Sequence, residues 1–300
     1  MTNKDIAKIY FQGNEIVALY RGDTLIFKKS GVVPPPSPKP TGTYKIKGTV
    51  TKSSGYTQFN LTYNNGQRVN VKVNKDLTFE TELQEPLTNA NAMFQGRSYL
   101  ETLDLNNLDT SQVTNMSNMF SQSIYLKDIK LSNFDTSKVT DMSYMFYDCE
   151  RLETLDLSNF DTINVKSARQ MISFCPKLKT VDASNFDTRN LSDFNSMFCN
   201  CDELTTLYAN IDFSKAYESL DLFHSDYLLT NIVGRFSNIK QSFFIESSPN
   251  LTVDSLMVII NGLATVTEKR KLALSATTYD SLTPEQIAIA TSKGWTVTRS

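Results

Sequence analysis

The sequence predicts an α/β solenoid built from a repeated unit of 26 residues. Leucines recur at this spacing without interruption, and each opens a near-copy of one phrase. The five leucines are Leu100, Leu126, Leu152, Leu178 and Leu204. A fixed period of about 20–50 residues is typical of stacked repeats, whose function lies on an extended surface. Within the phrase, the spacing of apolar residues changes from that of a strand to that of a helix, which predicts both elements in each unit.

Residues 1–30 are predicted to form a small β module. Short β-rich runs are separated by Gly13-Asn14 and Gly22-Asp23, pairs that are typical of tight hairpin turns. So short a segment buries too little apolar surface to fold by itself. Two interpretations stay open: it docks on the same chain, or it anchors the chain to another subunit. We predict the anchoring role for Ile9, Phe11, Leu19, Tyr20, Leu25 and Phe27.

Residues 31–42 are predicted to be an extended linker, because five prolines lie between residues 34 and 40. Such a stretch favours polyproline II, at about 3.1 Å per residue. Residues 43–89 then alternate apolar and polar side chains over 59–63, 69–73 and 77–83, and Asn65-Gly66 supplies a hairpin-turn signal. This part is predicted to be an antiparallel β unit that caps the N-terminal end of the repeats.

Residues 90–250 hold the repeats. In each copy Leu-x-x-Leu-x-Leu predicts a short strand, such as the one around Leu155 and Leu157. Apolar residues at helical spacing follow, and Asp135 stands where a helix N-cap belongs. In the best copy these are Val139, Met142, Met145 and Phe146. A strand, a loop and one or two helical turns per unit is the geometry of a leucine-rich repeat.

Residues 251–300 are predicted to be an α/β C-terminal cap. The pattern indicates a helix over 253–263 and a strand over 272–274. Thr283-Pro284-Glu285-Gln286 is a capping box with proline at the first helical position, and Gly294 ends that helix. Residues 295–298 are predicted to close the chain as a strand.

Composition excludes several kinds of function. The net charge of −2 gives no reason to expect a nucleic-acid partner, and the longest apolar runs are far too short for membrane insertion. The first residues lack the basic-then-apolar plan of a signal peptide, so we expect no cleavable export signal. A single histidine, His224, excludes histidine-based triads and metal clusters. We expect no cofactor and no metal.

The cysteines repeat with the same period. Cys149, Cys175 and Cys201 are 26 residues apart, so they should stack at one equivalent position as small buried thiols. Cys199 and Cys201 are too close in sequence for a zinc knuckle.

Carboxylates fall into two repeated sets. The residues Asp109, Asp135, Asp161 and Asp187 should accept backbone N–H bonds in a turn. A second set alternates with the core leucines of the strands and should point outward. The predicted binding face consists of Asp104, Asp128, Lys130, Thr154, Asp156, Thr180, Asp182, Thr206 and Tyr208. This face is a solvated sheet surface, a ligand-binding surface or, with Asp156 and Asp182 paired, a catalytic one.

The phrase from Leu126 to Cys149 resembles the BspA-type bacterial leucine-rich repeat, and the resemblance extends over residues 87–230. That family consists mostly of surface proteins that adhere to host proteins, other cells or glycans, so it implies a binding role. The segment from Leu282 resembles the ending of repeat proteins from Bacteroidales and their phages. Residues 1–30 resemble short N-terminal modules on structural proteins of Bacteroidetes phages.

These resemblances imply a non-enzymatic phage virion surface protein, such as a head or tail fibre or decoration protein. Residues 1–30 would bind other virion proteins, the repeats would bind a host surface protein or glycan, and the chain would form a homo-oligomer. One alternative is a bacterial cell-surface adhesin of the BspA type that is exported by a non-classical route. An alternative of a different class is a glycan-cleaving enzyme that uses Asp156.

Overall fold

The computed structural model describes residues 44–51, 55, 57–218 and 220–300, together with the backbone of three short strands nearer the N-terminus. These strands are β1 (Lys8–Gln12), β2 (Glu15–Arg21) and β3 (Thr24–Lys28). They pair in the order β1-β2-β3, and both pairs are antiparallel. The side chains predicted to anchor the chain and the predicted linker over 31–42 lie outside the described residues.

The described chain consists mostly of β-strands in several small sheets, with few helices. Its first strands after the linker are β4 (Lys45–Val50), β5 (Gln58–Tyr63), β6 (Gln67–Lys72) and β7 (Thr78–Glu82). β5 and β6 form an antiparallel hairpin. In the turn of this hairpin, Asn64 and Asn65 have left-handed backbone conformations, with φ of 46° and 58°. Gly66 follows as the third residue of the loop. The hairpin turn thus begins one residue earlier than the Asn-Gly pair indicates.

β4 connects this N-terminal unit to the repeats. It pairs antiparallel with β7 on one side and with β8 (Leu100–Asp104) on the other. β8 then pairs in parallel with β9 (Asp128–Lys130). Gly48 of β4 lies very close to the backbone of β8, since an added Cβ would lie 2.3 Å from the carbonyl oxygen of Thr102. A side chain at residue 48 would therefore push the two strands apart.

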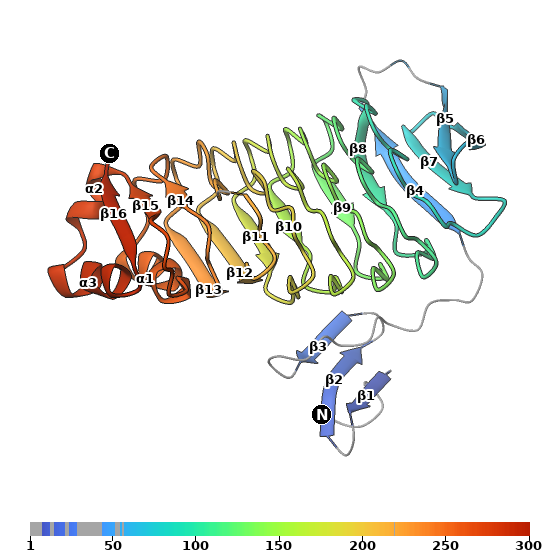
Figure 1. Cartoon of the computed structure of the whole chain (residues 1–300). Coiled ribbons are helices and arrows are strands. Elements are labelled where there is room, and N and C mark those ends of the chain that lie inside the picture. The colour runs from blue at the N-terminus through green and yellow to red at the C-terminus, as the bar shows by residue number, and fades with distance from the viewer. Residues whose placement is uncertain are drawn as a thin grey trace.

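The later repeats contribute one strand each to a parallel sheet. These strands are β10 (Thr154–Asp156), β11 (Thr180–Ala183), β12 (Thr206–Asp212) and β13 (Asn231–Ser237), and they pair in this order. The register between β10, β11 and β12 equals the sequence period, because Thr154 pairs with Thr180 and Thr180 with Thr206. Figure 1 shows the successive coils side by side in one row.

The predicted helical turns inside the repeats are wrong, since no helix lies between β8 and β13 in the described chain. The four residues at helical spacing are fully buried, but on a series of hydrogen-bonded turns. Tyr144 N donates to Arg169 O at 2.9 Å and Phe146 N to Met171 O at 2.8 Å, so these N–H groups bind the next repeat and not their own coil. Tyr144 also has a positive φ of 58°, which a right-handed helix does not allow.

These turns form a second ladder of hydrogen bonds between successive repeats, in addition to the ladder formed by the strands. Single parallel bridges connect Asn115, Asp141, Ser167 and Asp193 in succession. Stacked rings fill the space inside: Phe120 lies 5.3 Å from Phe146 between ring centroids, at an interplanar angle of 17°. Equivalent positions of the repeats stack on one another, so each apolar side chain is covered by the same position of the repeats before and after it.

The C-terminal part matches its predicted elements closely. It contains β14 (Phe243–Ile245), α1 (Val253–Gly262), β15 (Arg270–Leu274), α2 (Ala276–Asp280), α3 (Pro284–Ser292) and β16 (Trp295–Arg299). The predicted capping box is confirmed, since Thr283 and Gln286 exchange hydrogen bonds at the start of α3. β14, β15 and β16 form a parallel sheet, and α1 packs on β13. The described helices are all too short or too polar to cross a bilayer.

Candidate binding surface

The residues predicted as a binding face lie on the strands, at the positions that alternate with the buried leucines. Leu155, Val181 and Leu207 are buried on β10, β11 and β12, while the residues beside them point outward. The register aligns Asp156 with Asp182 and Asp182 with Tyr208. Parallel strands are about 4.8 Å apart, so these side chains form one continuous row.

The predicted face is divided into two parts. Asp104, Asp128 and Lys130 lie on β8 and β9, which belong to the sheet that contains β4. The remaining predicted residues lie on β10, β11 and β12, which belong to a different sheet. No strand pairing joins β9 to β10 in the described part of the chain, although the second ladder continues across this point from Asp141 to Ser167.

The strand aspartates hold the turns that follow their strands. Asp104 accepts the N–H of Asn106 at 3.1 Å, and Asp156 accepts that of Ser158 at 2.9 Å. Asp182 repeats the contact with Ser184 N at 3.0 Å. We missed this structural role, which the Asp-x-Ser and Asp-x-Asn spacings could have indicated. One oxygen of each carboxylate is thereby committed to the fold.

The charges of the face are partly paired between neighbouring repeats. Lys130 Nζ lies 3.8 Å from Asp104 Oδ2, and both side chains are accessible to water. Lys179 Nζ lies 2.7 Å from Glu153 Oε2 beside the face. Exposed pairs of this kind stabilise a fold by about 0–1 kcal/mol each, so their main effect is to moderate the acidity of the surface.

The second set of aspartates has the predicted role. Asp135 accepts the N–H of Ser137 at 3.1 Å, and Asp187 accepts that of Arg189 at 3.2 Å. The hydrogen bonds from the Arg189 side chain lower the pKa of Asp187. These residues support turns of the repeat.

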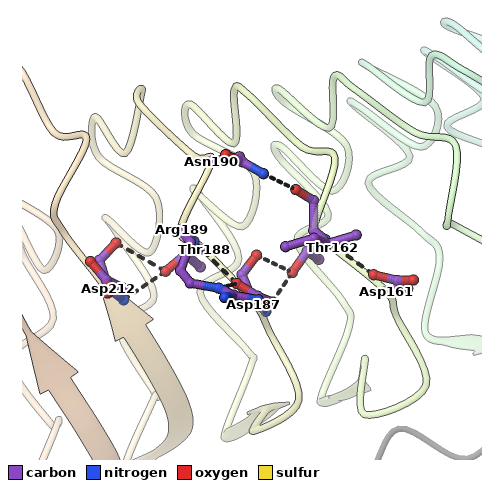
Figure 2. A network of polar contacts seen from close by, with 8 residues as sticks. Asp161, Thr162, Asp187, Thr188, Arg189, Asn190 and Asp212 are labelled. Carbon is purple, nitrogen blue, oxygen red and sulfur yellow. Dashed lines mark hydrogen bonds and ion pairs between the residues drawn. The ribbon is translucent and has the colours of Figure 1, made fainter.

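Buried threonines join consecutive repeats beside these aspartates. The hydroxyl of Thr162 donates to Asp187 O at 3.1 Å and accepts from Asp187 N at 2.8 Å. Thr188 makes the same two contacts with Asp212, at 3.1 and 2.7 Å. Figure 2 shows how this chain of hydroxyls runs from one coil to the next. Each threonine therefore satisfies both backbone groups of an aspartate in the next repeat.

A groove of about 470 Å³ lies at the ends of β11, β12 and β13, next to this network. Asn210 and Arg235, which pair in register on β12 and β13, contribute to its lining. Asp187 and Asp212 line it from the turns. The groove continues the outward row of β12 beyond Tyr208, whose side chain is 41% exposed. The strand face is thus polar and leads into an open groove at the ends of its strands.

The four cysteines are buried and unpaired, as predicted. Cys149 Sγ donates to Phe120 O at 3.3 Å and Cys175 Sγ to Phe146 O at 3.1 Å, the same contact one repeat apart. Burial raises the pKa of Cys199 to about 12 and that of Cys149 well above its ordinary value. No group of three or more metal-ligating side chains was found among the described residues.

The three N-terminal strands bring several of the predicted anchoring positions into register. Ile9 pairs with Leu19, and Leu19 pairs with Phe27. Tyr20 pairs with Leu25 across a register shift. β1 and β3 are the edges of this three-stranded sheet. The backbone therefore forms the predicted hairpins.

Comparison with known proteins gives one match. The family model described as "Mycoplasma protein of unknown function, DUF285" matches residues 88–212, which contain β8 to β12. This match is compatible with a BspA-type repeat protein and carries no information on phage modules. Neither the curated proteins nor the solved structures that were compared with the chain give a match.

Proposed function

We propose that the row of coils is a leucine-rich-repeat solenoid of the BspA type and that the chain is a non-enzymatic surface component of a phage virion. In this proposal the repeats bind a host surface protein or glycan. Residues 1–30 attach the chain to other virion proteins, and the chain works as a homo-oligomer. The parallel register of one repeat length and the family match to residues 88–212 support the repeat class.

The observation that carries the adhesive role is the open strand face. From Asp156 through Asp182 to Tyr208, side chains of one row stand on neighbouring strands, and those of Asp156 and Tyr208 are exposed. Adhesive surfaces of this kind gain affinity from many moderate contacts and from a few aromatic anchors. Tyr208 is the aromatic residue of this row.

The attachment role is supported by the N-terminal sheet. Within the described residues, β1 and β3 each have one edge that pairs with no other strand, and such an edge is a template for pairing with a strand of another chain. Three short strands also bury little apolar surface by themselves. Residues 1–30 would complete their sheet and their core on the virion.

Fractionation of phage particles tests the localisation. The chain should copurify with intact particles, and deletion of residues 1–30 should remove it from particles while the protein still accumulates in the cell. Particles that retain the shortened chain would refute the anchoring role. Absence of the full chain from particles would refute the virion assignment itself.

A binding assay with whole host cells tests the strand face. Fluorescently labelled full chain should bind the cells, and the double variant Asp182→Ala and Tyr208→Ala should bind at least tenfold more weakly. The matched control is Tyr227→Ala, because this tyrosine is also exposed, at 54%, but lies outside the strand face. Equal binding of the double variant and the control would show that another surface is used.

The second candidate is a bacterial cell-surface adhesin of the BspA type that reaches the surface by a non-classical route. The observation that favours it is the description of the matching family, which names a cellular bacterium and no phage. Surface labelling of intact producing cells distinguishes the two candidates. Labelled chain on cells that contain no phage particles would favour the adhesin.

A further inference from the structure

A cluster of aromatic side chains lies on the turns of the second ladder, outside the parallel strands. The rings of Tyr144 and Tyr147 are 5.6 Å apart between centroids, and those of Tyr147 and Phe174 are 5.2 Å apart. Phe174 is 39% exposed, and both tyrosines are partly exposed. The aromatic cluster (Tyr144, Tyr147 and Phe174) therefore spans two consecutive repeats at the surface.

Two of the three residues occupy backbone positions that disfavour them. Tyr144 has a φ of 58° and Phe174 a φ of 59°. In the other repeats the same two positions also have positive φ, but they hold small or polar residues. These are Ala92, Asn118, Gln170 and Ser196 at the position of Tyr144, and Gly96, Gln122, Asp148 and Asn200 at the position of Phe174. A bulky side chain in this region costs roughly 1–2 kcal/mol, and such an outlier points to a function that the ring performs.

Polar groups continue the cluster along the next two repeats. Arg169 Nε donates to the Tyr144 hydroxyl at 3.2 Å. This hydrogen bond raises the pKa of Arg169, and the charges of Asp193 and Glu218 add to the effect. Asp193 and Glu218 also line one small pocket with Tyr217. Tyr217 is itself 57% exposed. The aromatic cluster thus contacts a guanidinium directly, and two carboxylates follow on the next two repeats.

We propose that this surface binds a neutral glycan. A pyranose presents C–H groups with partial positive charge on one face, and the face of an aromatic ring is negative. Phe174 and Tyr147 offer such faces, while Arg169 and Asp193 offer a donor and an acceptor for the hydroxyls at the rim of the sugar.

The surrounding charges and the size of the cluster select this ligand. Asp193 and Glu218 line one small pocket together with Tyr217, so two negative charges lie side by side there and disfavour a sialylated or sulfated sugar. The rings are few and are bordered by polar groups, whereas a stable protein interface has a larger apolar centre and buries about 800 Å² per partner. An uncharged chain of hexoses fits both properties.

This inference shares the adhesive role of the proposed function but not its surface. The aromatic cluster belongs to the turns, and Tyr208 belongs to strand β12. Each site can therefore be removed without the other.

The test uses the full chain on an array of immobilised neutral oligosaccharides ending in glucose, galactose, mannose or N-acetylglucosamine, with sialylated counterparts beside them. The chain should bind at least one neutral glycan more strongly than its sialylated form. Phe174→Asn and Tyr144→Asn should each weaken that binding at least tenfold. Asparagine is the residue of equivalent repeats and suits a positive φ, so neither variant should lower the melting temperature.

The control is Tyr227→Asn, an exposed tyrosine outside both the cluster and the strand face. This variant should retain glycan binding. Binding that survives Phe174→Asn and Tyr144→Asn, a preference for sialylated glycans, or no binding to any neutral glycan would each overturn the inference. Host-cell binding that depends on Tyr208 alone would overturn the glycan-binding inference and leave the proposed function standing. Glycan binding by a chain that is absent from virions would support the inference and refute the virion assignment.

Discussion

A buried carboxyl group should make the stability of this protein depend on pH in a defined way. Asp226 lies 25 residues after Cys201 and is completely buried. Its Oδ1 accepts the N–H of Cys201 at 2.8 Å, while its Oδ2 has no hydrogen-bond partner among the described residues. Burial raises the pKa of Asp226 well above its ordinary value, and the negative charges of Asp202 and Asp221 add to the effect.

The sign of the effect follows from linkage. In the unfolded chain the carboxyl loses its proton near pH 3.9, whereas in the folded chain Asp226 keeps it. Stability is therefore lost as pH rises above the unfolded-state pKa, at about 1.4 kcal/mol per pH unit, until the folded-state pKa is reached. Asp226→Asn cannot ionise, so its advantage over the wild type should grow by roughly 1.4 kcal/mol per unit through this window.

Urea unfolding at several pH values between 4.5 and about 7.5 measures this difference, with the fluorescence of Trp295 as the signal. Trp295 is the single tryptophan, is buried, and donates its indole N–H to Ala264 O at 2.8 Å. Asp128→Asn is the control, because Asp128 is exposed and its charge is not among those that raise the pKa of Asp226. Stability curves of Asp226→Asn and wild type that run parallel over the whole range would refute the reasoning.

Three further predictions follow from buried contacts of the repeats. Thr162→Val should lower the free energy of unfolding by about 2–4 kcal/mol, because both backbone groups of Asp187 lose their hydrogen-bond partner. The control is Thr140→Val, which removes an exposed hydroxyl and should lower the free energy of unfolding by less than about 1 kcal/mol. Equal losses for the two variants in urea unfolding would contradict this prediction. Phe146→Ala should cost about 3–5 kcal/mol by the same measurement, since its ring is fully buried on a stacked neighbour, and a loss below about 1 kcal/mol would show that the stack contributes little. A thiol-reactive dye at pH 8 should label the four cysteines only after unfolding, because burial keeps thiols such as Cys199 protonated, and rapid labelling of the native chain would exclude this packing.

The 26-residue period alone predicted much of the fold. The stacking of Leu155, Val181 and Leu207 in register, and the repetition of one thiol contact at Cys149 and Cys175, follow directly from equal spacing. The capping box at the start of α3 was also readable, because it depends on residues only three positions apart.

The candidate sites were only partly readable. The strand positions of Asp156 and Tyr208 were correct, but the turn contact of Asp156 was missed. The aromatic cluster was missed altogether, although alignment of the repeats shows Tyr144 and Phe174 where other copies have small or polar residues. This difference between the repeats indicates a function only once the positive φ at Tyr144 and Phe174 is known, because bulky side chains are disfavoured there.

The sequence by itself determined which side chains of the repeats are buried, since burial follows from apolar periodicity whatever the backbone does. Only the tertiary structure decided the form of the backbone between the strands. Met142 and Phe146 have the spacing of a helix, yet their N–H groups bond to Ser167 and Met171 of the next repeat. Local spacing cannot distinguish these two partners, because the competing acceptors lie 25 residues away in the chain and come within reach only when the repeats stack.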